Sequence, residues 1–302
     1  MHSAPAPATP QRLVYLNGTY LRQQDATISI FDRGFLFGDS VYEVIPVYNG
    51  HPFRLDEHLQ RLDYSLSAIR LKNCFSHKEW SDIMTRVIDL NGRGYQSLYL
   101  QVTRGVAATR DHAFPEGTPP TVLVVSTAVS PPSAQYIEQP KTLAAICIDD
   151  FRWARCDIKS TSLLANVLLR QQAIEAQADE AILLRNGELT EGSASNIFMV
   201  KDGIVHTAPK SHYLLGGITR DLLIELMAQH HIECRQTQVS ENALRNADEI
   251  WLSSSSRELA PITRLDGQAV GTGQAGPLWK QVAALFFAYK QQLCKQLPTS
   301  AS

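Results

Sequence analysis

One lysine stands where the surrounding sequence makes a charged side chain unexpected. Lys159 lies between an apolar segment, 143–148, and a run typical of a helix, 163–175. A lysine ammonium is costly to bury unless it is paired or neutralised, and a desolvated lysine amine becomes nucleophilic near neutral pH. Lys159 is therefore a candidate for a Schiff base with a carbonyl compound such as pyridoxal phosphate (PLP). The alternative is a hydrated lysine at the end of a strand.

Two polar stretches and one arginine could hold an anion such as a phosphate group. A glycine pair, 216–217, leads into a helix with Thr219 as a plausible N-cap, and free N–H groups and the helix dipole attract negative charge there. Ser253–Ser256 places four hydroxyls after a strand, and Arg61 lies on the polar side of an amphipathic helix. The alternatives are an ordinary N-cap, a polar loop and a solvated arginine. Neither stretch has the glycine spacing of a nucleotide-binding loop.

An acid and a possible carboxylate clamp complete the candidate residues. Glu191 follows a short predicted strand, and a carboxylate facing a pyridine nitrogen would keep that nitrogen protonated and strengthen the electron sink of PLP. Arg110 and His112 stand two residues apart in a loop and, with Tyr42, offer donors for a small carboxylate. A surface acid and a flexible loop are the alternatives. Taken together, the candidates supply each group that a PLP enzyme needs.

Short strands and hairpins dominate the pattern that must position these residues. Asn-Gly or Asp-Gly pairs predict turns at 17–18, 49–50, 186–187 and 202–203. Apolar periodicity predicts helices at 58–69, 80–90, 163–175 and 282–293, and strands at 40–48, 97–105, 121–126, 143–148 and 249–254. Many short strands with a few helices in each half predict an α+β fold and not a parallel doubly wound sheet.

The length of 302 residues is enough for two domains. A Pro/Ala-rich N-terminus predicts a disordered arm at 1–11, followed by an α+β domain at 12–128. Three prolines predict an interdomain linker at 129–141. The second α+β domain, 142–302, carries Lys159.

Composition excludes several classes of function. A net charge of -2 leaves no basic surface for nucleic acid or an anionic membrane. The five cysteines are scattered without a CxxC pair, which argues against a zinc site or a disulfide framework and for a reducing compartment. The N-terminus lacks the pattern of a secretion signal, and no apolar run approaches the ~20 residues of a membrane span. We expect a cytoplasmic protein without a metal site.

Five short motifs stand out along the chain, namely Asp32-Arg-Gly-Phe-Leu-Phe-Gly-Asp-Ser-Val-Tyr-Glu-Val, Thr103-Arg-Gly, Arg155-Cys-Asp-Ile-Lys-Ser, Glu191-Gly-Ser-Ala-Ser-Asn and Gly217-Ile-Thr-Arg-Asp. They resemble motifs of the fold-type IV PLP enzymes, the class IV aminotransferase family, and in particular of its D-amino-acid aminotransferase branch. The resemblance runs from about residue 13 to residue 290. Two features depart from the family pattern: the loop 105–112 is one residue longer, and Arg257 is an additional cation after the serine run.

The resemblance implies a role for each candidate residue. Lys159 would be the Schiff-base lysine and Glu191 the partner of the pyridine nitrogen, with Leu215 packed on the ring. The residues that would hold the phosphate are Arg61, Ile218, Thr219, Ser254 and Ser255. Tyr42, with Arg110 and His112 of the partner subunit, would bind the substrate carboxylate in a homodimer.

By the same resemblance, the reaction would be transamination. A D-amino acid such as D-alanine would give its amino group to 2-oxoglutarate or pyruvate through the Lys159 Schiff base. An R-selective amine transaminase or a branched-chain L-amino-acid transaminase on the same scaffold is the alternative. A remote alternative from another class is a non-catalytic PLP-binding protein.

Overall fold

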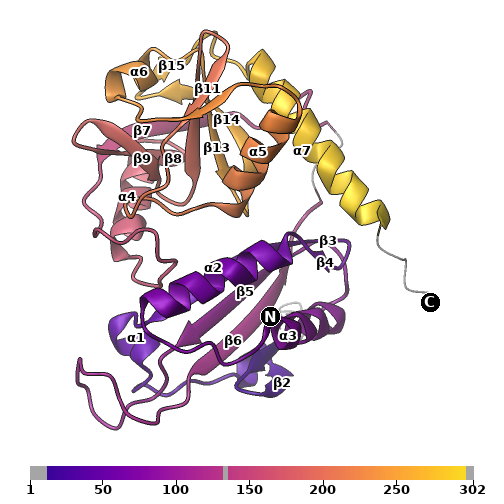
Figure 1. The fold of residues 1–302 in the computed structure, drawn as a ribbon, viewed down its shortest axis with the longest axis vertical. Helices are drawn as coiled ribbons and strands as arrows, with labels where there is room; N and C mark the ends of the chain where they lie inside the picture. The colour runs from indigo at the N-terminus through magenta and orange to yellow at the C-terminus, as the bar shows by residue number, and fades with distance from the viewer. Residues whose placement is uncertain (1–11, 132–134, 297–302) are drawn as a thin grey trace, which may run out of the picture. The chain divides into compact units, whose positions relative to one another are not determined.

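The computed structural model describes residues 12–131 and 135–296. The chain forms two compact units, which divide between Ser130 and Pro131 (Figure 1). The predicted arm at 1–11 lies outside the described residues, as do residues 132–134 of the segment 129–141. The assignment of that segment as a linker therefore stays a prediction.

A six-stranded antiparallel sheet forms the frame of the first unit. Its strand order is β2-β1-β6-β5-β3-β4. The strands are β1 (Leu13–Leu16), β2 (Thr19–Arg22), β3 (Ser40–Tyr48), β4 (His51–Pro52), β5 (Gln96–Thr103) and β6 (Thr121–Ala128). Alternate residues of β5, Leu98, Leu100 and Val102, are fully buried, because successive side chains of a strand point to opposite faces.

Two amphipathic helices pack against this sheet (Figure 1). Helix α2 (Leu55–Ala68) contacts β3, and helix α3 (His77–Leu90) contacts β1 and β6. Helix α3 begins before the predicted start at Trp80, because Ser76 caps it in a capping box with Glu79. A 3-10 turn (Gln23–Asp25) and the short helix α1 (Arg33–Phe37) join β2 to β3.

A nine-stranded mixed sheet forms the second unit. Eight strands follow the order β12-β11-β10-β13-β14-β7-β8-β9, and β15 pairs with β14. The strands are β7 (Leu143–Asp149), β8 (Glu180–Arg185), β9 (Glu188–Gly192), β10 (Asn196–Lys201), β11 (Ile204–Thr207), β12 (Cys234–Gln236), β13 (Glu249–Ser254), β14 (Glu258–Leu265) and β15 (Gln268–Ala269). Only the pairs β11–β12, β14–β7 and β7–β8 are parallel within the described part of the chain.

Strand alternation divides the apolar residues of this unit between two cores. Ile182 and Leu184 of β8 face the main core, whereas Ala181 and Leu183 face helix α4 (Leu164–Glu175). Helix α5 (Ile218–Gln229) packs on β13 and on helix α7 (Pro277–Gln296). The short helix α6 (Glu241–Arg245) adds Leu244 to the main core.

The structure confirms the α+β class and the predicted turns, and it corrects several details. The first residue of every predicted turn has a φ of 48° to 55°, and the glycine that follows also has a positive φ, at 17–18, 49–50, 186–187 and 202–203. The sequence analysis missed the strands β4, β12, β14 and β15 and the short helices α1 and α6. Strand β14 contains Pro261, which pairs with Trp251 of β13, although a proline within a run argues against a strand.

The predicted N-cap of α5 is wrong. Gly217 is the N-cap, with an extended backbone, and Thr219 lies within the first turn of the helix. Within the described ranges, no helix is both long enough and apolar enough to cross a membrane.

Candidate active site

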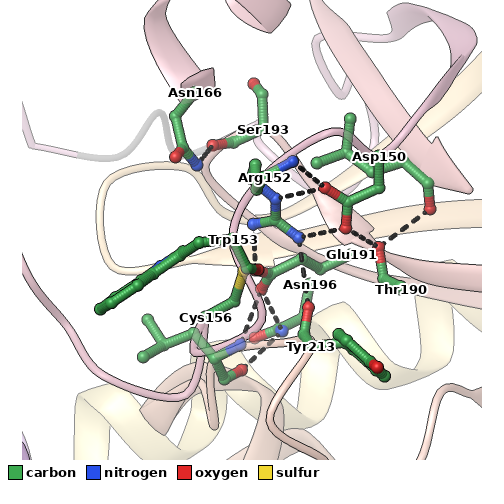
Figure 2. A network of polar contacts seen from close by, with 12 residues as sticks. Asp150, Arg152, Trp153, Cys156, Asn166, Thr190, Glu191, Ser193, Asn196 and Tyr213 are labelled. Carbon is green, nitrogen blue, oxygen red and sulfur yellow. Dashed lines mark hydrogen bonds and ion pairs between the residues drawn. The ribbon is translucent and has the colours of Figure 1, made fainter. Parts of the chain in front are cut away.

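An arginine buried between two carboxylates lies at the centre of the candidate site in the second unit (Figure 2). Nε and Nη2 of Arg152 each lie 2.9 Å from an oxygen of Asp150. Nη1 donates to Oε1 of Glu191 at 2.5 Å. The side chains of Asp150 and Glu191 are 0% and 7% exposed. The planar guanidinium therefore fixes the orientation of the Glu191 carboxylate in a nearly dry environment.

Burial and pairing act in opposite directions on these two acids. Burial raises the pKa of Glu191, and the Arg152 guanidinium offsets only part of that effect. Burial also favours the neutral form of Asp150, but the hydrogen bonds and charge of Arg152, helped by Arg185, lower its pKa. The ionised form is therefore favoured more strongly at Asp150 than at Glu191. A further positive partner, such as a protonated ring nitrogen, would favour the ionised form of Glu191.

Leu215 and Asn196 surround the second oxygen of Glu191. The backbone N–H of Leu215 donates to Oε2 at 3.0 Å, and Nδ2 of Asn196 lies 3.4 Å from the same oxygen. Nδ2 of Asn196 also donates to the Leu215 carbonyl at 2.9 Å. A Cβ atom on Gly217 would clash with Oδ1 of Asn196, so a side chain at that position would displace Asn196. These contacts join β9, which carries Glu191, to the segment before α5.

The two predicted parts of the anion site meet at Asn196. Asn196 pairs with Ser253 across β10 and β13, and Ser254 and Ser255 follow at the end of β13. On its other side, Asn196 contacts Leu215, three residues before the first turn of α5 with Ile218 and Thr219. Serine hydroxyls and the first N–H groups of a helix are donors that suit a phosphate. Asn196 thus has a partner in each of the two segments that carry these donors, and phosphate binding by those segments stays a prediction.

Lys159 lies in an irregular segment that is tied to the same site. The backbone N–H of Cys156 donates to the His212 carbonyl at 2.8 Å. Ile158 and Ser160, on either side of Lys159, are only 6% and 7% exposed, and Lys159 is half-buried. Burial raises the pKa of the Cys156 thiol to about 11, so this cysteine is a packed, un-ionised group. The Schiff-base role of Lys159 stays a prediction.

Glu180 holds the turn that follows Glu191. Its carboxylate accepts hydrogen bonds from the backbone N–H of Ser193 at 3.1 Å, from the Ser193 hydroxyl, and from the Ser195 hydroxyl at 2.9 Å. Nη1 of Arg257 lies 3.5 Å from Oε2 of Glu180. The backbone N–H of Arg257 donates to Oγ of Ser254 at 3.0 Å. Arg257 thus connects the turn at Ser254 to Glu180, whose carboxylate holds the turn after Glu191.

In the first unit, a buried carboxylate holds Arg61. Nε and Nη2 of Arg61 donate to the two oxygens of Glu43 at 2.8 and 2.7 Å. Nδ1 of His58 lies 2.8 Å from Oε2 of the same acid. Burial favours the neutral form of Glu43, but Arg61 and His58 lower its pKa to about 2. Glu43 therefore fixes the Arg61 guanidinium, and phosphate binding by Arg61 stays a prediction.

The predicted carboxylate-binding residues fall into two groups in this unit. Tyr42 of β3 stacks on Tyr99 of β5, with ring centroids 5.7 Å apart. Arg110 and His112 both lie against Phe37, with Cζ of Arg110 5.0 Å and the His112 ring 5.2 Å from the Phe37 centroid. One aromatic ring thus brings the two loop side chains together.

Sequence reasoning missed five residues that shape these sites, namely Glu43, Phe37, Asp150, Arg152 and Asn196. Some signals were present in the sequence. Glu43 shares a strand face with the fully buried Val41, so an acid there needs a partner. Arg152 and Asp150 are opposite charges close to Lys159, but their burial depends on chain segments far away in sequence.

Comparison with known proteins decides the family. A family model described as amino-transferase class IV matches residues 40–265. A D-alanine aminotransferase from Bacillus licheniformis is 41% identical over 269 residues, which cover 89% of this chain and 94% of that protein. The chain belongs to the class IV aminotransferase family. The resemblance found in the sequence is therefore confirmed.

Solved structures of the family share the fold. A branched-chain amino acid aminotransferase from Escherichia coli matches with a TM-score of 0.82 and 28% identity, over 92% of this chain and 94% of that chain. A branched-chain amino acid aminotransferase from T.th., solved with pyridoxamine 5'-phosphate, matches with a TM-score of 0.83 and 26% identity, over 91% of this chain and 92% of that chain.

The enzyme is a PLP-dependent aminotransferase, and the residues of the second unit fit this cofactor. Glu191 is a buried, oriented carboxylate suited to a protonated pyridine nitrogen. Ser254, Ser255 and the first turn of α5 offer neutral donors suited to phosphate oxygens. Lys159 supplies an amine seven residues after Arg152, whose guanidinium pairs with Glu191.

Proposed function

We propose that this enzyme moves the amino group of a D-amino acid, such as D-alanine, to 2-oxoglutarate or pyruvate. The observation that carries the proposal is the 41% identity to a protein named D-alanine aminotransferase, over nearly the whole length of both chains. Identity to the E. coli branched-chain enzyme is only 28% over a similar length. The pairing of Arg110 and His112 on Phe37 supports a site for a substrate carboxylate.

PLP, when bound, supplies an electron sink for negative charge at the substrate Cα. In the proposal, Lys159 would hold the cofactor, and its Nζ would move the proton at the substrate Cα. Glu191, oriented by Arg152, would pair with the pyridine nitrogen. Leu215 would pack on the ring, and the residues that would hold the phosphate are Ile218, Thr219, Ser254, Ser255 and Arg61.

We further propose that the enzyme acts as a cytoplasmic homodimer in which Arg110 and His112 serve the partner's site, with Tyr42 completing the clamp. Leu164, Val167 and Leu168 are 73%, 59% and 48% exposed on α4, and Ile30 and Phe35 of the first unit are 72% and 67% exposed. Apolar side chains clustered at a surface favour association with another protein surface. A second copy is the partner that the clamp requires.

A half-reaction screen tests the proposal. The PLP-loaded enzyme is mixed with D-alanine, L-alanine, L-leucine and (R)-1-phenylethylamine, and conversion of the cofactor to its pyridoxamine form is followed by absorbance. We expect conversion with D-alanine and little with the other donors. A preference for L-leucine or for the amine would refute the D-amino-acid assignment in favour of the alternatives. A lack of conversion with every donor would favour a non-catalytic PLP-binding protein.

The substitution Arg110→Ala tests the clamp separately. Loss of a charge-assisted hydrogen bond in the bound complex should raise the KM for D-alanine about tenfold or more. The same substitution should leave the reaction with an amine that lacks a carboxylate nearly unchanged. An equal effect on both donors would reject the role of Arg110.

A further inference from the structure

A buried arginine lies beneath the exposed loop that carries Arg110 and His112. Arg33 of α1 is only 3% exposed. Its Nη1 donates to the carbonyl oxygens of Asp111 at 2.5 Å and Ala113 at 3.1 Å, and its Nη2 donates to that of His112 at 3.2 Å. Three successive carbonyls of the loop therefore converge on one guanidinium.

Asp39 fixes that guanidinium from the opposite side. Nε of Arg33 donates to Oδ2 of Asp39 at 2.8 Å. Arg104 donates to the two oxygens of the same carboxylate at 2.7 and 3.0 Å. Burial favours the neutral form of Asp39, but Arg104 and Arg33 outweigh it and lower its pKa. Asp39 therefore remains an anion that holds Arg33 in place over the working pH range.

The two ends of the loop are attached to the same group of residues. At the start, the backbone N–H of Arg33 donates to the Gly105 carbonyl at 2.9 Å, and Asp32 forms a β-bridge with Val106. At the far end, Cζ of Arg104 lies 3.7 Å from the centroid of the Phe114 ring. The intervening residues 107–113 depend on Arg33 for three of their backbone hydrogen bonds.

Phe37 links Arg33 to the loop side chains, because Arg33, Arg110 and His112 all contact its ring. It lies one helical turn after Arg33 in α1, and Cζ of Arg33 is 4.9 Å from its ring centroid. Arg110 and His112 contact the same ring. A cation is attracted to the face of an aromatic ring. The helix that binds the loop backbone thus also supplies the surface on which both side chains rest.

We propose that Arg33 is a positioning residue for substrate binding, which holds residues 111–113 so that Arg110 and His112 are presented together on Phe37. The inference rests on the proposed function, because it takes these two residues to bind the substrate carboxylate. A lysine cannot replace Arg33, since a single ammonium lacks the planar fork that reaches Asp39 and three carbonyls at once.

The substitution Arg33→Lys tests the inference with two measurements. Hydrogen–deuterium exchange of peptides covering 106–114 should become about tenfold faster or more, because the loop opens more often once its carbonyls lose the Arg33 guanidinium. The KM for D-alanine should rise by a similar factor, about tenfold, while kcat stays within about threefold. Arg22→Lys is the matched control, since Arg22 pairs with Asp25 at the surface with 47% of its side chain exposed. This control should change neither measurement.

A second variant keeps the test decisive if Arg33→Lys folds poorly. Phe37→Leu retains apolar volume but removes the ring, so the KM should rise with a smaller change in exchange at 106–114. Unchanged exchange in Arg33→Lys would overturn the proposal. Faster exchange with an unchanged KM would also overturn it, provided that Arg110→Ala raises the KM. If Arg110→Ala leaves the KM unchanged, the clamp itself is refuted, and the positioning role is rejected with it.

Discussion

Replacing Arg152 by methionine would remove a cation that Asp150 and Glu191 share. Both carboxylates are almost completely buried, and Arg152 donates two hydrogen bonds to the first and one to the second. Methionine has a similar length and keeps the apolar contacts of the side chain. The substitution therefore isolates the charge and the hydrogen bonds from the volume.

The structure sets the size of the expected effect. Removing one partner of a buried ion pair costs about 3–5 kcal/mol, because the remaining charge is left without compensation. For a unit of this size each kcal/mol lowers the Tm by about 2–4 °C, so Arg152→Met should lower the Tm by roughly 6–20 °C. Burial already raises the pKa of Glu191, and without Arg152 this pKa rises further. The ionised form of Glu191 should then be disfavoured, which makes this acid a poorer partner for a protonated pyridine nitrogen.

Thermal unfolding and steady-state kinetics measure the two consequences. The matched control is Arg235→Met, because Arg235 pairs with Glu233 at the surface with side chains 50% and 55% exposed. An exposed pair contributes about 0–1 kcal/mol, so the control should barely shift the Tm. In the Arg152→Met enzyme we expect kcat to fall about a hundredfold or more, the size seen when an oriented electrostatic partner is lost.

A double substitution distinguishes an effect of Arg152 that acts through Glu191 from a general loss of structure. If Arg152 acts by keeping Glu191 ionised, Glu191→Gln should reduce kcat strongly in the natural enzyme but add little in the Arg152→Met background. Fully additive effects on kcat would refute the reasoning. A Tm that falls by no more than in Arg235→Met would refute the estimate of stability.

Two further predictions concern Lys159 and Glu43. Lys159→Ala should abolish transamination and leave a cofactor-free protein that is folded and unfolds in a single thermal transition, because the truncated side chain is only half-buried; normal turnover by this variant would eliminate the assignment. Glu43 has a pKa lowered from 4.5 to about 2, so its stabilisation is complete above pH 4.5 and is lost as the pH falls toward 2. Unfolding between pH 2 and 7 should show Glu43→Gln less stable by roughly 3 kcal/mol at neutral pH, with the difference vanishing near pH 2; a difference independent of pH would contradict the pairing with Arg61 and His58.

Local chemistry made much of the fold readable from the sequence. The Asn-Gly and Asp-Gly turns were predictable because few other residue pairs tolerate two successive positive φ angles. The apolar stripe of α2 was visible because one buried helix face repeats every three or four residues. Other details could not be read in this way. Pro261 lies inside β14, where a proline argues against a strand. The N-cap at Gly217 could not be distinguished from Thr219, because both alternatives leave free N–H groups at the same helix end.

The sequence by itself determined the residue types of the site, namely the amine of Lys159, the carboxylate of Glu191 and the donor-rich segments at 216–219 and 253–256. Tertiary structure alone decided which charges are neighbours. Arg152 meets Glu191 across 39 positions of sequence, and Arg33 meets the loop at 111–113 across about 80. Such pairs leave no periodic pattern in the sequence, because the two partners come together only when segments far apart in the chain pack in the folded protein. Burial then strengthens each interaction, since the low dielectric of the interior raises both the benefit of pairing and the cost of its loss.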